Sequence, residues 1–255
     1  MGLWAFKAQA QLAQRVDGKQ QRRREDKTTT QHNTTQHNNM PLHPRYAVSH
    51  CLSGAPLASS NTVEVFLDFN CPFSAKMFRK LQDEVVPAIR EDRESQNQNQ
   101  SSKDASFNLW MINVVQPWHG VQSSILHDVS FAVARSAPSK YGAIARVLFD
   151  NIERFYDSEV QDLTRRQITQ SVLELISEKL TLEEKRSVEA LLYIAPNSGN
   201  AGNGVGVDNK YFAKYSRTLG IHVTPTVVVN GIVVPSIESS TESENIVSIL
   251  KDVTN

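Results

Sequence analysis

Cysteine is scarce in this sequence, and long apolar runs are absent. Only Cys51 and Cys71 are present, too few thiols for a scaffold held by disulfides or for a zinc site built mainly from thiolates. No apolar stretch approaches the roughly 20 residues that a membrane-spanning helix needs. Ligand spacings typical of zinc or calcium are also missing, so we expect no metal site and a reducing, cytoplasmic compartment.

The sequence also has no excess of positive or of negative charge. Lys and Arg together number 27, and so do Asp and Glu, which leaves a formal net charge of zero. Such a chain has no global field that would attract nucleic acid or an anionic membrane, and we expect neither as a partner. A Gly-x-Ser-x-Gly elbow is absent, and the glycines within 199–206 match no dinucleotide-binding pattern, so we expect no bound cofactor.

The first 44 residues differ in composition from the rest of the chain. Gln, Arg, Thr, His and Asn dominate residues 8–39, and the pentad Thr-Thr-Gln-His-Asn occurs at 29–33 and again at 34–38. This composition cannot bury enough apolar surface to offset the entropy of ordering, so we predict a disordered extension over 1–44 and a folded domain over 45–255. The beginning of the chain lacks an apolar secretory core, but its basic, acid-free composition makes a mitochondrial presequence the alternative to a cytoplasmic location.

The folded region shows strand patterns at both ends and a long helical block between them. A strand, a helix and a second strand in succession predict a right-handed parallel unit, to which a later hairpin adds antiparallel strands. The helical block is then an insertion between the two halves. The expected elements are a strand at 63–69, a helix at 74–93, a strand at 107–115, helices within 122–194, a helix at 208–220, a hairpin with an Asn-Gly turn at 223–234 and a helix at 243–251.

Several residues mark the expected ends and breaks of helices. Thr181 and Glu184 have the spacing of a capping box. Asp208 is expected to cap the helix that follows it, and Gly220 to end that helix. Pro87 is expected to kink the first long helix or to make it restart, because proline removes a backbone donor and clashes with the preceding turn.

Cys71 stands between a predicted buried strand and a predicted helix. A thiol at the start of a helix faces unpaired backbone N–H groups and the positive end of the helix dipole, both of which favour the thiolate. Pro72 suits the first helical turn, where its missing N–H costs nothing, and Ser74 can offer a hydroxyl hydrogen bond to the sulfur. The alternative is that Cys71 is simply a small buried hydrophobic residue.

Thr224 and Pro225 stand at the start of the predicted hairpin. A proline there would interrupt a central ladder, and a cis Thr–Pro bond is one way to avoid this. A cis turn would also leave the backbone of Thr224 free to pair with an extended substrate. An ordinary trans proline at the start of a strand is the alternative.

Two segments of the chain resemble the DsbA-like branch of the thioredoxin superfamily. They read Phe-Leu-Asp-Phe-Asn-Cys-Pro-Phe-Ser at 66–74 and Val-Thr-Pro-Thr-Val-Val-Val-Asn-Gly at 223–231, and the resemblance covers about 60–253. It implies an α/β fold, namely a thioredoxin-like fold with an inserted α-helical subdomain at about 120–215.

The resemblance also implies roles for individual residues. Cys71 matches the nucleophilic cysteine of the family, and Thr224 with Pro225 matches the cis-proline loop beside it. Ser74 stands where redox-active members carry a resolving cysteine, so the motif Cys-Pro-Phe-Ser cannot form the internal disulfide of a dithiol oxidase. The expected catalytic residues are Cys71 and Ser74, and Pro72 and Phe73 are expected to contact the substrate.

Three functions remain compatible with this motif. In the first, Cys71 acts as a single nucleophilic thiol on a thiol or disulfide substrate, which is a protein or glutathione, with glutathione also a candidate co-substrate. In the second, the protein is related to the kappa-class glutathione transferases and their isomerase relatives. In the third, it is a binding module without turnover, since a fold does not determine a function.

Other candidates lie outside the two segments. Trp118 and His119 follow the second strand and are expected to overlook the nucleophile, where the histidine could stabilise a thiolate or shuttle a proton. The alternative is a packed tryptophan beside a surface histidine. His222 is a further candidate for the border of the cleft around Cys71. Cys51 is expected not to reach Cys71.

Overall fold

The computed structural model describes residues 42–53, 61–96 and 107–254. Most of the extension predicted over 1–44 therefore lies outside the described residues. Across the described ranges, no helix has both the length and the apolar composition that crossing a bilayer requires.

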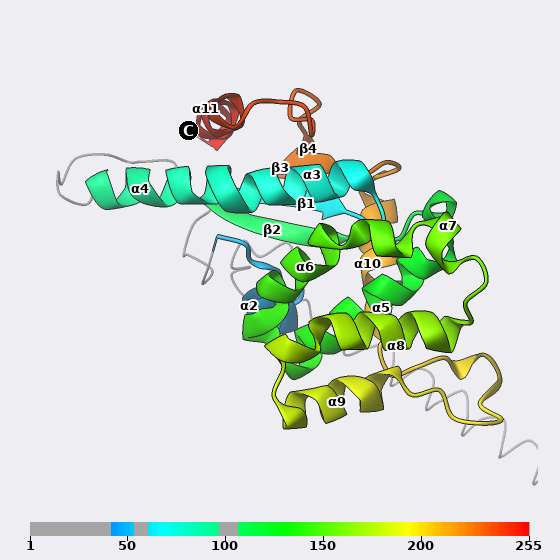
Figure 1. Ribbon diagram of the computed structural model, residues 1–255. Coiled ribbons are helices and arrows are strands. Elements are labelled where there is room, and N and C mark those ends of the chain that lie inside the picture. The colour runs from blue at the N-terminus through cyan, green and yellow to red at the C-terminus, as the bar shows by residue number, and fades with distance from the viewer. Residues whose placement is uncertain (1–41, 54–60, 97–106, 255) are drawn as a thin grey trace, which may run out of the picture. The chain divides into compact units, whose positions relative to one another are not determined.

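The described residues form a four-stranded sheet with the strand order β2-β1-β3-β4 (Figure 1). β1 pairs in parallel with β2 and antiparallel with β3, and β3 continues into β4 through the Asn-Gly turn. The turn has positive φ at Asn230 and Gly231 (50° and 84°), as a type I′ turn requires. The strands are β1 (Asn61–Leu67), β2 (Phe107–Asn113), β3 (Thr226–Val229) and β4 (Ile232–Val233).

Helices cover both faces of this sheet. α3, α4 and α11 lie on one face, and α10 with most of the inserted helices lies on the other (Figure 1). The helices that follow β2 extend from Gly120 to Thr218, the region in which the insertion was expected. The helices are α2 (Ala47–His50), α3 (Pro72–Lys80), α4 (Val86–Gln96), α5 (Gly120–Ser136), α6 (Tyr141–Asp150), α7 (Asp157–Val160), α8 (Arg165–Ile176), α9 (Leu182–Leu192), α10 (Gly206–Thr218) and α11 (Ser243–Thr254).

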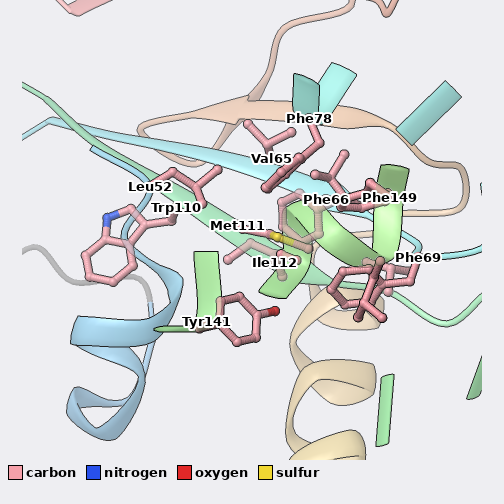
Figure 2. Close-up of a cluster of buried hydrophobic side chains, with 14 of the residues drawn as sticks. Leu52, Val65, Phe66, Phe69, Phe78, Trp110, Met111, Ile112, Tyr141 and Phe149 are labelled. Atoms are coloured by element: carbon pink, nitrogen blue, oxygen red, sulfur yellow. The ribbon is translucent and has the colours of Figure 1, made fainter. Parts of the chain in front are cut away.

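The core consists of large side chains on the two faces of β1 and β2. Val65 lies toward Phe78 of α3, whereas Phe66 stacks on Tyr215 of α10 at 6.1 Å between ring centroids (Figure 2). Alternate residues of β1 therefore serve opposite faces of the sheet. Phe78 also packs against Phe149 of α6, which ties the inserted helices to the sheet. Truncation of a fully buried phenylalanine such as Phe78 is expected to cost about 3–5 kcal/mol.

The first long helix begins earlier and is less regular than the sequence suggests. It starts at Pro72 and changes to a π-helical segment over Leu81–Val85 before α4 begins at Val86. Pro87 is the second residue of α4 in a helix that continues without a break from α3, and the wider turn just before it, in which the N–H of Val86 bonds to the carbonyl of Leu81, accommodates the proline. The expected restart at this proline takes the form of a π-helical segment just before it.

The expectation that Asp208 caps a helix is wrong. α10 begins at Gly206 with Val205 at its N-cap, and no side chain caps it. Asp208 is buried instead, and its carboxylate accepts a hydrogen bond of 2.6 Å from the Tyr46 hydroxyl and lies 3.5 Å from Arg135. These long-range partners hold the carboxylate more firmly than a local backbone N–H would. The capping box of Thr181 and Glu184 is present as predicted.

Candidate functional site

Three loops meet at one edge of the sheet. Because β1 and β2 are parallel and in register from Asn61↔Phe107 to Leu67↔Asn113, the loops that follow them leave from the same edge. β3 is antiparallel to β1 and begins opposite Phe66, which brings the Thr224–Pro225 loop to that edge as well. The fold thus assembles residues 68–74, 114–119 and 222–225 into one site.

Cys71 is held between the start of α3 and the Thr224–Pro225 loop. It is the N-cap of α3, with Pro72 in the first turn, and only 2% of the residue is exposed. Its thiol donates a hydrogen bond of 3.3 Å to the carbonyl oxygen of Thr224. The Thr224–Pro225 peptide bond is cis. Cys71 and the proline loop, which are far apart in the sequence, are therefore in direct contact.

Ser74 is fully buried but does not act as the sequence suggests. Its hydroxyl accepts a hydrogen bond of 3.2 Å from the backbone N–H of Asp68, rather than donating one to the sulfur of Cys71. The expectation of a Ser74–sulfur hydrogen bond is therefore not met. The physical reason is that the tight turn after β1 leaves the N–H of Asp68 without a backbone partner, and Ser74 supplies the acceptor.

Asp68 lies beneath this turn as a fully buried carboxylate. Its Oδ1 accepts hydrogen bonds from the backbone N–H of Asn70 at 2.8 Å and from the Ser123 hydroxyl at 2.7 Å. Its Oδ2 accepts a hydrogen bond of 2.7 Å from the backbone N–H of Gln116. Asp68 therefore joins the loop after β1, the loop after β2 and helix α5.

Two histidines complete the surroundings of Asp68. His119 places Nδ1 3.0 Å from Oδ2, and His127 places Nε2 3.5 Å from Oδ1. Burial alone would raise the pKa of Asp68, but the hydrogen bonds from His119 and His127 outweigh it and hold the pKa below its ordinary value. Asp68 is therefore a buried negative charge compensated by several donors.

The two ring nitrogens of His127 have different partners. The Ser130 hydroxyl donates to the backbone carbonyl of His127, so it is an acceptor toward the Asn113 amide. That amide in turn donates to Nδ1 of His127 at 3.0 Å, while its oxygen accepts from the Tyr141 hydroxyl at 2.7 Å. On the other side of the ring, Nε2 of His127 lies 3.5 Å from Oδ1 of Asp68 and 3.4 Å from the backbone nitrogen of Phe69.

The exposure of Trp118 and His119 is the reverse of the alternative given above, which was a packed tryptophan beside a surface histidine. Trp118 is 61% exposed, whereas the side chain of His119 is 17% exposed and is bound to Asp68. The backbone carbonyl of His119 also accepts a hydrogen bond of 2.8 Å from the Asn70 side chain. The histidine is thus anchored through the residue that precedes Cys71.

Exposed apolar side chains come from all three loops of the site. Phe73 is 61% exposed, and Trp118 and Val223 are also exposed. Two buried polar atoms in the same loops, Oδ1 of Asn70 and Oγ1 of Thr224, have no hydrogen-bond partner among the described residues. The predicted contact residues Phe73 and Trp118 therefore lie at the surface of the site, while its unused hydrogen-bonding atoms lie beneath.

Some residues of the site were not identified from the sequence. Burial raises the pKa of Tyr156, and the negative charges of Glu153 and of a Cys71 thiolate raise it further, so the tyrosine lies within electrostatic range of the thiol. Tyr156 belongs to the inserted helices, and no pattern in the sequence around it indicates that it lies near Cys71. Asp68 had one, because a carboxylate directly after a buried apolar strand needs partners.

Cys51 and the histidines outside the cluster lie elsewhere. The backbone of Cys51 bridges Trp110 in the middle of β2, and its sulfur lies 3.4 Å from the Ser53 hydroxyl. No disulfide joins Cys51 to Cys71. His222 lies two residues before Thr224 and is exposed, at the mouth of a pocket beside the site. Within the described ranges, no three His, Cys, Asp or Glu side chains gather in a metal-binding cluster.

The fold with this site is similar to several solved structures. A candidate protein-disulfide isomerase from Pseudomonas syringae is 23% identical with a TM-score of 0.55, and the match covers 74% of this chain and 93% of that one. Oxidised BdbD from Bacillus subtilis is 18% identical with a TM-score of 0.50, covering 76% and 87%. MdbA, a thiol-disulfide oxidoreductase from Actinomyces oris, is 11% identical with a TM-score of 0.50, covering 75% and 80%.

These likenesses define the fold class. The chain has a thioredoxin-like fold of the DsbA-like type, with helices inserted between the two halves, which confirms the fold predicted from the sequence. No protein-family model and no curated protein matches the sequence. The structural neighbours are distant in sequence, so the chemistry of this chain has to be argued from its own residues.

Proposed function

We propose that the protein is a thiol–disulfide oxidoreductase that uses Cys71 as a single nucleophilic thiol. The observation that carries this proposal is the contact of 3.3 Å between the Cys71 sulfur and the carbonyl oxygen of Thr224, at the start of α3. A helix start favours the thiolate, and the cis-proline loop presents an extended backbone beside it. A purely structural cysteine would need neither feature.

The absence of a second thiol in the motif defines the reaction. The Cys71 thiolate attacks one sulfur of a mixed disulfide, forms a new S–S bond to it and releases the other sulfur as a thiolate, which takes up a proton. A second thiolate from solution then attacks the newly bound sulfur, forms a disulfide with it and releases the Cys71 thiolate. One disulfide is consumed and one is formed, so electrons balance without any further oxidant.

The Asp68–His119 pair supports this exchange by handling the proton. His119 faces the ionised Asp68 with Nδ1 at 3.0 Å, which leaves Nε2 as the ring nitrogen available for proton transfer. We assign to this nitrogen the acceptance of the Cys71 thiol proton and its return to the departing thiolate. The buried carboxylate stabilises the imidazolium that forms in between, and it holds the ring in orientation.

Glutathione is the proposed second thiol, and a glutathionylated protein or peptide is the proposed substrate. The exposed apolar residues Phe73, Trp118 and Val223 can contact the chain around the disulfide. This reaction requires a pool of reduced thiol, so we propose that the protein works in a reducing compartment, with the cytoplasm as the first candidate.

The test is glutathione-dependent reduction of a glutathionylated peptide. Cys71→Ser is expected to lower the rate by at least 100-fold, because the other thiol of the chain, Cys51, lies away from the site, and Cys51→Ala is expected to stay within two-fold. Intact-mass spectrometry of the wild type is expected to trap glutathione on Cys71.

The outcomes separate the alternatives. Glutathione-transferase chemistry that survives Cys71→Ser would contradict the proposal and favour the kappa-type alternative. Absence of both exchange and adduct in the wild type would contradict it in favour of a binding module.

A further inference from the structure

A pocket lies directly beside the site, between α10 and the loop that follows β2. We call it the α10 pocket, and its volume is about 290 Å³. Asn113, Gln116 and Phe131 contribute to it from the buried interior, and Trp118, Arg217 and His222 line it nearer the surface. Small-molecule sites start at about 300 Å³, so this space suits a small ligand or one end of a larger one.

The ionisable residues that line the α10 pocket are all basic. Arg217 supplies a guanidinium and His222 an imidazole, and no acidic residue of the described chain lines the pocket. Among the described residues, neither Arg217 nor His222 forms an ion pair. A guanidinium without a carboxylate partner is available for a bidentate contact with a carboxylate of a ligand.

The α10 pocket is connected to the thiol site through Gln116. The backbone N–H of Gln116 binds Asp68, and its side-chain amide donates a hydrogen bond of 3.1 Å to the backbone carbonyl of His222. His222 is followed two residues later by Thr224, whose carbonyl contacts the Cys71 sulfur. Two residues of extended chain span roughly 7 Å. A ligand of a few residues could therefore reach from the pocket to the sulfur.

We infer that the α10 pocket binds a carboxylate of the small thiol that releases Cys71, so that the thiol is held within reach of the mixed disulfide. This inference rests on the proposed monothiol function and adds a binding site for its second reactant. Arg217 pairs with the carboxylate, His222 donates a further hydrogen bond, and Trp118 covers the aliphatic part of the ligand. Small thiols that carry carboxylates, such as glutathione, are favoured over neutral ones.

The experiment measures the binding of S-methylglutathione to the Cys71→Ser protein by calorimetry. This probe keeps both carboxylates but cannot exchange disulfides. We expect saturable binding that Arg217→Gln weakens at least five-fold and His222→Gln weakens less. Lys214→Gln, an exposed cation on the same helix that does not line the pocket, is expected to stay within two-fold. The diethyl ester of the probe is expected not to bind.

Several results would overturn the inference. One is that S-methylglutathione does not bind the folded Cys71→Ser protein. Another is that Arg217→Gln and Lys214→Gln weaken its binding equally. A third is that the diethyl ester binds as tightly as the probe itself. In the wild-type background, Arg217→Gln is expected to raise the KM for glutathione at least five-fold with kcat within two-fold. Exchange activity that is insensitive to Arg217→Gln would contradict the pocket alone, whereas probe binding without any exchange activity would contradict the proposed function alone.

Discussion

Cys51 and Cys71 are both almost inaccessible, at 7% and 2% exposure, yet they occupy different environments. Cys71 lies at the edge of the sheet where three loops meet, next to a helix start and a backbone carbonyl. Cys51 lies along the outer side of β2, where its backbone bridges Trp110. Burial therefore does not distinguish the two cysteines, whereas their positions relative to the carboxyl ends of the parallel strands do.

The polar residue beside each cysteine shows the same contrast. Near Cys71, the buried Asp68 is ionised and receives hydrogen bonds from several groups. Next to Cys51, His50 is also fully buried, but burial lowers its pKa to about 3 and Nε2 has no hydrogen-bond partner among the described residues. The region around Cys71 therefore contains a buried charge that hydrogen bonds compensate, whereas the region around Cys51 keeps its buried histidine uncharged. The predictions below test that difference, beginning with the largest expected effect.

Ser74→Cys should convert the thiol site into one with a dithiol motif. The new thiol would lie three residues after Cys71 in the first turn of α3, within the geometry that a disulfide needs. Under mild oxidation the variant is expected to lose both thiols of the motif, as counted by alkylation and mass spectrometry, while Cys51 stays reduced. Ser74→Ala is the control. Two persistent thiols in the motif would show that the turn does not bring the positions together.

Asp68→Asn should destabilise the fold by about 3 kcal/mol, because a buried charge network loses the group that its donors share. The measurement is urea-induced unfolding followed by tryptophan fluorescence. Asp150→Asn is a matched control, since Asp150 pairs with Arg79 and Arg146 but its side chain is 38% exposed, and its loss should cost less than about 1 kcal/mol. Equal losses of unfolding free energy in the two variants would show that Asp68 stabilises the fold no more than the partly exposed Asp150 does.

His50 should make the fold sensitive to mild acid. The folded protein keeps His50 neutral down to about pH 3, whereas the unfolded chain protonates it near 6.5. Its contribution is therefore constant above pH 6.5 and is lost as the pH falls below 6.5, by about 1.4 kcal/mol per pH unit. Urea unfolding from pH 7 to 5 should show this slope in the wild type and a reduced one in His50→Phe. Parallel curves for the two proteins would contradict a neutral, buried His50.

The sequence predicts the fold class and the thiol motif because both depend on local patterns. The apolar run before Cys71, the helical spacing after it and the Asn-Gly hairpin each lie within a few residues, and the parallel pairing of β1 and β2 follows from their order. The register between those strands, which brings the loops together, is visible only in three dimensions.

The contacts that support the site could not be predicted in the same way. Asp68 binds groups from two later loops, and Ser74 turns toward the backbone rather than toward the sulfur. Tyr156 and Arg217 approach from the inserted helices, whose placement depends on tertiary packing. Asp208 was misassigned for the same reason, because a buried long-range partner outweighed its local preference for a cap. The roles of Phe73 and Trp118 in substrate binding stay predictions.

The most direct test of the account is the alkylation rate of Cys71 relative to Cys51 in the same folded molecule. Iodoacetamide at pH 7, with peptide mass spectrometry, reports both rates in one sample, so each cysteine serves as the reference for the other. We predict that Cys71 reacts at least ten-fold faster in the folded protein and that the ratio falls to about one in urea, because the helix start favours a thiolate only when it is formed. Equal rates in the folded protein, or faster labelling of Cys51, would contradict the assignment of Cys71 as the nucleophile.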